Sequence, residues 1–580
     1  MSLDIFAFND THGNVKDTDG KGIGIAKTTT LLKEISSADN SIFISQGDMW
    51  QGSVESNYTR GNLVTEWMNS MNFVSMTVGN HEFDWGTDVI KQNSELANFP
   101  TLGINVLNRN NNQIADFVSP STTFIRSGAK IGVIGAIGDC YGSISGSRVK
   151  DVYFAQGDTL TNMVKQESTR LRNEEKCDFI IYSIHGAGDR DKDDRYDISL
   201  SSGHYVDLVL EGHTHADYCY QDSYNIYHIQ SYAYNQEFYK ITVNLDLTNS
   251  SFTVTDTVSY DTRYSGPYRN YAEDAAVNAL FTKYYDKYAF AYEPIGNVST
   301  RKYPTELKSK IADLYLEAGL KKWNNQYDVL LGGGYISCRG SYLEAGQVLY
   351  TQLNDLFPFD NDIVLCSISG YYLKSTSFYT LENSNYYVTW SSYGNSVKDS
   401  INDYSTYYVV TDQYSLDFTQ NHLTYVDTYD FGVYARDLLK DYIAAGNWYD
   451  APSGHEGTAE DPRTVAEALE YAYTHPGSSA YNAGSLALYY KGVVSRQAAY
   501  VSGQGDMSKV YIKDEGTDNE IMIYYLKKTQ NNSGSTWTDV NELKLGDELI
   551  VCGKAFYYNS TTPELDNSTW VYSINGVRTA

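Results

Sequence analysis

The chain has 580 residues, 42% of them hydrophobic, and a formal net charge of −28 at pH 7. It is too long for a single hydrophobic core, so we expect two to four domains. The negative charge argues against binding nucleic acid or an anionic membrane, and no apolar run approaches the ~20 residues of a membrane-spanning helix.

Residues 1–258 alternate short apolar runs with amphipathic stretches. Near-continuous apolar runs predict buried strands, which we place at 3–8, 41–45, 130–137, 178–184 and 206–210. Most of these runs lead into glycine or a polar residue. Because ligand sites in α/β sheets form beyond the carboxyl ends of the strands, we expect a site on the loops that follow. The segment 241–258 has the pattern of an antiparallel strand pair.

The rest of the chain predicts further regions. Residues 259–290 are expected to form a helical linker, with its helix near 271–288. Residues 291–449 predict an α+β domain with helices at 307–320 and 431–446, a glycine-rich turn at 330–336, and strands at 362–370 and 407–414. Residues 455–580 predict a helix that opens at Asp461-Pro462, followed by five strands that suggest a small OB-like β-barrel. This accessory region is acidic, so we expect a spacer, surface-attachment or weak glycan-binding module.

Five short blocks in the first 215 residues place possible metal ligands beside glycine. They read F-N-D-T-H-G, Q-G-D-M-W-Q-G, G-N-H-E-F-D, I-H-G-A-G and E-G-H-T-H. Glycine lets the backbone turn sharply at a strand end and leaves room for a metal and a phosphate. One Asp-x-His is uninformative, but five such blocks in this order predict a dinuclear metal site.

The order of the blocks resembles that of the calcineurin-like metallophosphoesterases, and G-N-H-E-F-D-W-G resembles the bacterial 5′-nucleotidase branch of that family. The resemblance implies an α/β fold in which residues 1–258 form a two-sheet α/β/β/α sandwich, with 241–258 in the second sheet. It also implies that residues 291–449 form a 5′-nucleotidase C-terminal substrate-binding domain.

The same resemblance implies two divalent metal ions, such as Zn, Mn or Co, that share a bridging carboxylate and activate a water for attack on phosphorus. It assigns Asp10, His12 and His215 to the first metal, Asn80, His185 and His213 to the second, and Asp48 to both. His81 is not a ligand in this pattern. We expect it to stabilise the developing charge and to protonate the leaving alkoxide, with Asp84 orienting its ring; the alternative is a structural loop histidine.

The family binds its nucleotide with a G-G-G turn, an F-P-F-G-N block and a later aromatic residue. This chain has G-G-G-Y-I-S-C-R-G and F-P-F-D-N. We therefore expect Phe359 and Tyr414 to stack on the base and Asn361 to bond its edge. The family's arginine after G-G-G-I is replaced by Ile336, which leaves Arg339 as the phosphate clamp. The family's ribose-binding loop is absent, so 5′, 3′ or cyclic preference stays open.

These expectations favour a metal-dependent phosphomonoester hydrolase that releases a nucleoside and inorganic phosphate. The alternatives are a 2′,3′-cyclic-nucleotide phosphodiesterase/3′-nucleotidase, a nucleotide-sugar hydrolase, or a surface nucleotide-binding or adhesive protein without activity. The expected partner is a small nucleotide, with no nucleic acid and no integral membrane segment. Oligomeric state is open. The six separated cysteines predict buried thiols. We expect an extracytoplasmic location with the leader absent from this chain, and a cytoplasmic one as the alternative.

Overall fold

The computed structural model describes the chain from residue 2 to 579 outside a set of short segments. These segments are 19–21, 187–195, 249–250, 264–266, 324–325, 328–329, 376–388, 392–399, 419–421, 431, 449–454, 456, 475, 478–485, 502–504, 531–535 and 559–561. The chain clusters into two compact units. The first comprises Met1–Glu293, Lys308–Arg339 and Tyr350–Leu438, and the second comprises Pro294–Leu307, Gly340–Leu349 and Leu439–Ala580. The domain boundaries expected at 258, 291, 449 and 455 stay a prediction.

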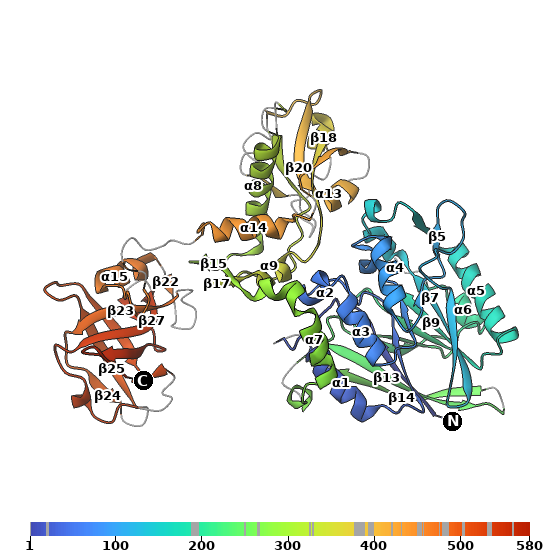
Figure 1. The fold of residues 1–580 in the computed structure, drawn as a ribbon, viewed down its shortest axis with the longest axis horizontal. Coiled ribbons are helices and arrows are strands. Elements are labelled where there is room, and N and C mark those ends of the chain that lie inside the picture. Colours follow the sequence, from blue (N-terminus) through green and yellow to red (C-terminus); the bar gives the residue numbers. More distant parts are fainter. Residues whose placement is uncertain are drawn as a thin grey trace. The chain divides into compact units, whose positions relative to one another are not determined.

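Two six-stranded sheets form the framework of residues 2–261 (Figure 1). The first has the order β14 (Ser251–Asp261), β13 (Glu237–Asp246), β1 (Ser2–Phe8), β2 (Ser41–Ser45), β3 (Ser75–Thr77) and β4 (Thr101–Leu102). The second has the order β11 (Tyr218–Gln221), β12 (Tyr227–Gln230), β10 (Leu208–Glu211), β9 (Phe179–His185), β7 (Ala129–Ile137) and β6 (Ser121–Arg126). Strands β1 to β4 are parallel, as are β7, β9, β10 and β12, so their carboxyl ends share one edge of each sheet.

Apolar side chains fill the space between the two sheets. Ile5 of the first sheet and Ile181 of the second are fully buried in one core cluster. Helices cover the outer faces (Figure 1): α1 (Gly24–Ile35) and α3 (Asn62–Ser70) lie on the first sheet, and α5 (Asp158–Asn173) lies on the second. On the first face, Trp67 of α3 packs edge-on against Phe8, with ring centroids 6.2 Å apart. The predicted α/β/β/α sandwich is therefore present.

The predicted antiparallel pair at 241–258 is present as β13 and β14, but not in the expected sheet. β13 pairs antiparallel with β1, with Val243 opposite Leu3, so the pair extends the first sheet and not the sheet of β7, β9 and β10. The alternation of β13 turns Ile241 and Leu245 into the inter-sheet core, which either sheet would allow. The pairing with β1, more than 200 residues away, decides which sheet the strand joins.

The predicted helix near 271–288 is α7 (Ala275–Tyr288). It begins at Asp274, whose carboxylate accepts the backbone N–H groups of Ala276 and Val277. The helix lies against α1, α2 (Val54–Tyr58) and α3. Residues 275–288 of the expected linker are therefore helical and packed on the first sheet's helical layer, whereas its first residues, 259–261, still belong to strand β14.

A five-stranded sheet occupies the region between 330 and 428. Its order is β19 (Thr389–Trp390), β16 (Leu330–Gly334), β20 (Thr406–Asp412), β18 (Ile363–Ser369) and β21 (Thr424–Thr428). Helices α8 (Pro304–Lys322), α9 (Tyr350–Leu356), α13 (Gln413–Phe418) and α14 (Ala435–Ala444) accompany it. The glycine-rich turn expected at 330–336 is wrong, because most of it is strand β16. A side chain at Gly332 would place its Cβ 2.2 Å from the Ala312 carbonyl oxygen, so glycine is required for α8 to approach this strand.

The described part of the last region contains the α-helix α15 (Val465–Thr474) and a closed ring of strands. β23 (Ala487–Val494), β25 (Asp506–Lys513), β26 (Glu520–Leu526), β28 (Thr562–Leu565) and β27 (Glu548–Tyr558) pair in that order, and β27 pairs back with β23. Helix α15 begins later than the expected start at Asp461-Pro462. Its start is set by Thr464, whose hydroxyl accepts the Glu467 N–H while the Glu467 carboxylate accepts the Thr464 N–H. Among the described residues no helix is long and apolar enough to span a bilayer.

Candidate metal centre and substrate loop

The five sequence blocks converge at strand ends of both sheets. β1, β2 and β3 of the first sheet lead into the first three blocks, while β9 and β10 of the second sheet lead into the last two. The residues delivered are Asp10 and His12 after β1, Asp48 after β2, Asn80 after β3, His185 at the end of β9, and His213 and His215 after β10. The parallel arrangement of the strands brings together residues that lie up to 205 positions apart, as the strand-end expectation requires.

Backbone strain is concentrated at these residues. Five of the seven expected ligands have positive φ angles: Asp10 (49°), His12 (47°), Asp48 (54°), His213 (87°) and His215 (57°). A non-glycine residue held in a sparsely populated backbone region costs roughly 1–3 kcal/mol and persists where its surroundings enforce it. Such a cluster in one place is typical of a functional site.

Two of the flanking glycines permit the close approach of these loops. A Cβ on Gly79 would lie 2.2 Å from Asp48 Oδ1, and a Cβ on Gly212 would lie 2.9 Å from the Nδ1 of His185. Both distances are shorter than carbon allows, so alanine at either position would push a ligand out of place.

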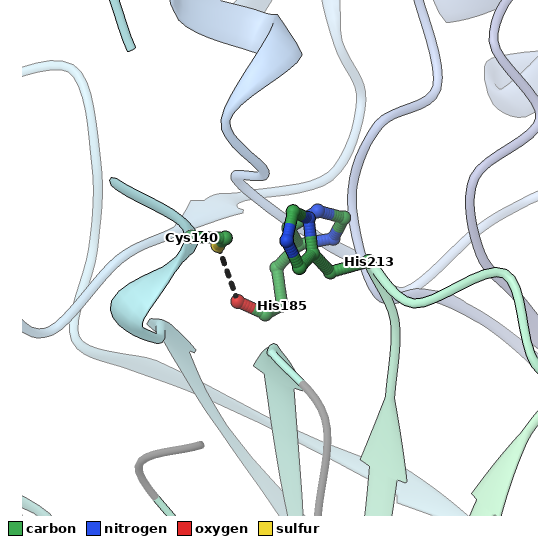
Figure 2. Close-up of side chains that lie close together, drawn as sticks. All are labelled: Cys140, His185 and His213. Atoms are coloured by element: carbon green, nitrogen blue, oxygen red, sulfur yellow. Dashed lines mark hydrogen bonds between the residues drawn. The ribbon is translucent and has the colours of Figure 1, made fainter. Parts of the chain in front are cut away.

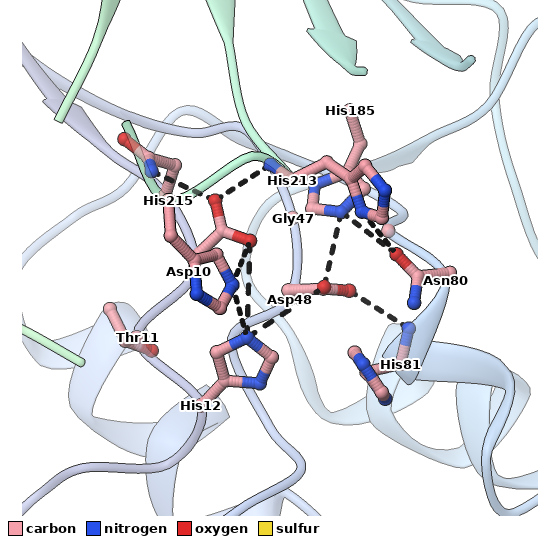
Figure 3. Close-up of polar contacts among 12 residues, drawn as sticks. Asp10, Thr11, His12, Gly47, Asp48, Asn80, His81, His185, His213 and His215 are labelled. Atoms are coloured by element: carbon pink, nitrogen blue, oxygen red, sulfur yellow. Dashed lines mark hydrogen bonds and ion pairs between the residues drawn. The ribbon is translucent and has the colours of Figure 1, made fainter. Parts of the chain in front are cut away.

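One group of ligand atoms lies on the β1 side of the centre (Figure 3). The Nε2 atoms of His12 and His215 are 3.1 Å apart, and His215 Nε2 is 3.3 Å from Asp10 Oδ1. Asp10 and His12 are buried, and His215 is about one third exposed. These are the three residues expected to hold the first metal.

The other group lies around Asn80 (Figure 3). Its side-chain oxygen is 3.1 Å from both His185 Nε2 and His213 Nδ1. Asp48 Oδ2 is 3.1 Å from His185 Nε2 and 3.9 Å from His12 Nε2, so this carboxylate reaches both groups. The predicted bridging residue therefore lies between the two clusters.

The donor set fits divalent cations. The Nδ1 atoms of His12 and His185 lie 3.1 and 2.7 Å from the backbone carbonyls of Gln51 and Gln46. If each Nδ1–H donates to its carbonyl, the Nε2 atom of the same ring carries a lone pair. That lone pair faces other electron-rich atoms, and a bound cation between them would remove the repulsion. Asp10 Oδ1 is buried and lacks a hydrogen-bond partner. Burial lowers the pKa of His185, but the charge of Asp48 outweighs it and raises that pKa to about 10, a measure of how strongly this position attracts positive charge.

His81 is not one of the seven expected ligands, although one of its ring nitrogens lies within 4.8 Å of ligand atoms of His12 and Asp48. Its ring Nδ1 is 2.8 Å from Asp84 Oδ2, and its backbone N–H donates to Asp48 Oδ1 at 2.8 Å. Burial lowers the pKa of His81, but the charges of Asp84 and Asp48 outweigh it and raise the pKa to about 9. The structure thus places His81 and Asp84 in the expected contact at the edge of the centre.

Two residues near the centre were not identified from the sequence. Glu82 accepts the backbone N–H groups of Asp48, Met49 and Gly79 at 2.7–2.9 Å, which ties two ligand loops together. Cys140 donates its thiol to the His185 carbonyl at 3.0 Å and lies beside His213 (Figure 2). The acidic residue after G-N-H was a visible signal for Glu82, whereas nothing in the sequence placed Cys140 here. The expectation of buried thiols is met by Cys140, Cys177, Cys366 and Cys552, while Cys219 and Cys338 are half-buried.

Two of the expected substrate residues lie against the catalytic histidine candidate. The Phe359 ring stacks on the His81 ring, with centroids 5.7 Å apart and an interplanar angle of 18°. The guanidinium carbon of Arg339 lies 5.1 Å from the centre of the Phe359 ring. Within the described part of the chain, no carboxylate pairs with this guanidinium.

The other two expected substrate residues lie nearby in the chain. Asn361 is half-buried in the loop between α9 and β18. Tyr414 is in α13 rather than at the strand end that was predicted, because β20 ends at Asp412. The Gln413 N–H donates to the Asp362 carbonyl at 2.8 Å, so α13 starts beside the loop that carries Asn361.

Comparison with known proteins identifies the class of the site. Residues 3–217 match the family described as calcineurin-like phosphoesterase, whose members use divalent metals, and these residues contain all seven expected ligands. Residues 3–217 therefore resemble a calcineurin-like phosphoesterase domain.

The chain is also similar in sequence to individual proteins. The chain is 30% identical over 226 residues to an apyrase of Tabanus yao and 31% identical over 231 residues to protein UshA of Yersinia enterocolitica. Each match covers 37% of this chain and about two fifths (39% and 41%) of the relative. A longer match, 26% identical over 418 residues, covers 63% of this chain and 74% of the silent protein UshA(0) of Salmonella typhimurium.

Solved structures extend the likeness in fold beyond residue 217. The 5′-nucleotidase precursor of Thermus thermophilus superposes with a TM-score of 0.58 at 17% identity, over 77% of this chain and 96% of that one. The 5′-nucleotidase of Candida albicans gives 0.52 at 14% identity, over 76% and 98%. At these identities the comparison concerns the fold alone.

Proposed function

We propose that the chain is a metal-dependent phosphomonoester hydrolase of the 5′-nucleotidase type, which releases a nucleoside and inorganic phosphate. One observation carries the proposal. Seven oxygen and nitrogen ligands form two groups joined by Asp48, with His81 and the aromatic ring of Phe359 immediately beside them.

Two divalent ions, when bound, would activate a water and neutralise charge on the phosphoryl oxygens. Asp10, His12 and His215 would hold one ion and Asn80, His185 and His213 the other, with Asp48 shared. The carbonyls of Gln51 and Gln46 orient two of these imidazoles, and Glu82 fixes the backbone of the Asp48 loop. The chain thus supplies a preformed ligand set in which the rings of His12 and His185 have a fixed tautomer.

His81 serves as the proton donor to the leaving oxygen. Its contact with Asp84 through Nδ1 leaves Nε2 for the substrate, and the Asp84 carboxylate stabilises the protonated ring. The backbone bond from His81 to Asp48 sets the distance between this donor and the metal ligands. The proton donor and the metal ligand Asp48 are therefore linked directly by a hydrogen bond.

The substrate is held by Arg339 and by the loop after α9. Arg339 clamps the phosphate, since it approaches His81 and Phe359 and has no carboxylate partner in the described chain. Phe359 and Tyr414 stack on the base and Asn361 bonds its edge. An aromatic face adds about 1–3 kcal/mol per stacked base with little base selectivity.

Phosphate release from AMP, 3′-AMP, 2′,3′-cAMP and UDP-glucose tests the proposal. We expect AMP to be the best substrate and its hydrolysis to require added Mn²⁺, Zn²⁺ or Co²⁺ after treatment with EDTA. Preference for 3′-AMP or 2′,3′-cAMP, or for UDP-glucose, would assign the alternative enzyme activities. Binding of AMP without release of phosphate from any of the four would leave the non-enzymatic nucleotide-binding alternative.

We infer that the ring of strands β23–β28 is an OB-like barrel. Five strands that close through the β27–β23 pairing support this. We propose that this barrel serves as a spacer, surface-attachment or glycan-binding module. We also propose that the protein has an extracytoplasmic location.

A further inference from the structure

The loop of residues 357–362, called the substrate loop below, contains a buried carboxylate. The Asp360 side chain is 5% exposed. A buried carboxylate is costly unless it is paired. Its surroundings therefore indicate why this chain has it.

The Asp360 carboxylate joins three partners. Its Oδ1 accepts from Arg436, which is itself 1% exposed, and its Oδ2 accepts from Arg60. The indole Nε1 of Trp85 donates to the same Oδ2 at 3.1 Å. One carboxylate thus balances two guanidinium groups and one neutral donor.

These partners come from different parts of the first compact unit. Trp85 lies four residues after His81, just beyond the short helix η1 (His81–Phe83), and Arg60 follows α2. Arg436 belongs to the first turn of α14. Asp360 therefore connects the segment that carries the proton donor to the segment that carries Phe359.

The backbone of the substrate loop is fixed by the same residues and their neighbours. All four carbonyls from 357 to 360 accept hydrogen bonds from side chains. Arg436 Nη1 donates to the Phe357 and Phe359 carbonyls at 3.1 and 3.0 Å, Gln51 and Asn57 donate to Pro358 at 3.0 and 3.1 Å, and Arg148 donates to Asp360 at 3.0 Å. These contacts hold the backbone of the loop at the place where the Phe359 ring stacks on His81.

We propose that Asp360 is a positioning residue that holds Phe359 against His81, and so aligns the nucleoside end of the substrate with the proton donor to the leaving oxygen. The inference rests on the proposed function and adds a specificity determinant to it. A phosphomonoester with a nucleoside needs this alignment. A small aryl phosphate needs only the metals, Arg339 and His81.

Asp360→Asn tests the inference, because it keeps the shape and the Trp85 bond but removes the charge that balances the two arginines. When one partner of a buried ion pair is removed, the other charge stays buried without compensation. We expect kcat/KM for AMP to fall about tenfold or more, mainly through KM, while kcat/KM for p-nitrophenyl phosphate stays within about twofold. Asp360→Gly, which restores the residue of the family motif, should behave in the same way.

Asp207→Asn is the matched control. Asp207 is also a buried carboxylate paired with an arginine, Arg172, but it directly precedes β10, at the opposite end of that strand from His213. Both substrates should be hydrolysed by this variant as by the unchanged protein. If the Asp360 variants do not fold, Arg60→Gln removes the more exposed partner of Asp360, whose side chain is 42% exposed. We expect kcat/KM to fall less than in Asp360→Asn, and again to fall more for AMP than for p-nitrophenyl phosphate.

Hydrogen exchange of the backbone amides of 357–362 supplies a readout independent of activity. We expect faster exchange in Asp360→Asn than in Asp207→Asn. Equal losses for AMP and p-nitrophenyl phosphate, or unchanged exchange together with unchanged AMP kinetics, would overturn the inference. If the unchanged protein hydrolyses p-nitrophenyl phosphate but not AMP, the proposed function fails. Hydrogen exchange of residues 357–362 in Asp360→Asn would then still show whether Asp360 holds the substrate loop in place.

Discussion

The metal centre and the substrate loop lie side by side but are built in different ways. Each ligand of the centre follows a strand end in a short block with its own glycine, and the parallel sheets bring the blocks together. The substrate loop is held by contacts across about 300 residues, such as those of Arg60 with Asp360 and Gln51 with Pro358. Local sequence therefore encodes the chemistry of the site, while long-range contacts encode its fit to the substrate.

The largest effect should come from the residue that joins both ligand groups. Asp48→Asn removes the bridging charge, so we expect phosphate release from AMP to fall to near the uncatalysed rate and the metal content per chain to drop. Elemental analysis and a phosphate assay measure both. Asp116→Asn, whose side chain is 78% exposed on the surface, should change neither. Normal metal content with full activity in Asp48→Asn would remove this residue from the site.

The proton donor should matter next. His81→Ala removes general acid catalysis, so kcat for AMP should fall about 100-fold or more while both metals are retained. Asp84→Asn should give a smaller loss of kcat, because the ring stays but its orienting charge is gone. Loss of metal in His81→Ala would contradict its assignment and make it a ligand.

A variant of Arg339 tests whether this residue binds the phosphate or the nucleoside. Arg339→Ala should raise KM for AMP and for p-nitrophenyl phosphate by similar factors of about ten, since the phosphate is common to both and a charged hydrogen bond contributes about 1.5–3 kcal/mol. Arg339→Lys should recover part of this loss. An effect confined to AMP would place Arg339 on the nucleoside and not on the phosphate.

The smallest effect concerns stability behind the metal centre. His228 is buried with Nδ1 3.1 Å from Glu211 and Nε2 3.4 Å from Asp222. Burial lowers its pKa, but these carboxylates outweigh burial and raise the pKa above the ordinary value. The stabilisation is therefore complete below about pH 6.5, the unfolded value, and is lost as pH rises through the folded pKa.

Denaturant unfolding of the metal-free protein across pH 6 to 9 measures this effect. The free energy of unfolding should decline more steeply over that range in the unchanged protein than in His228→Gln. The same slope in both proteins would show that His228 does not hold the extra proton.

Much of the fold and of the metal centre could be predicted from sequence because each signal was local. Apolar runs located β2, β7 and β9 within a residue or two, and the glycine-flanked blocks located the seven clustered side chains. The errors arose where a distant partner decided the outcome. Gly332 lies in a strand against α8, where only glycine leaves room for the Ala312 carbonyl. Helix α15 starts at Val465, where the carboxylate of the distant Asp514 accepts the N–H groups of Val465 and Ala466.

The substrate loop could be predicted only in part, for the same reason. The F-P-F-D-N block identified Phe359, but neither its contact with His81 nor the pairing of Asp360 with two arginines has a signal in the neighbouring sequence. Cys140 beside His185 is a similar case, since only the fold brings the two strands' ends together.

Metal titration of the EDTA-treated protein, followed by phosphate release from AMP, tests the central claim most directly. Mn²⁺ or Zn²⁺ is added in steps, and bound metal and activity are measured at each step. We predict two ions per chain, with activity that appears as the second ion binds. Full hydrolysis of AMP by metal-free protein, or two bound ions with no phosphate release from any nucleotide, would contradict it.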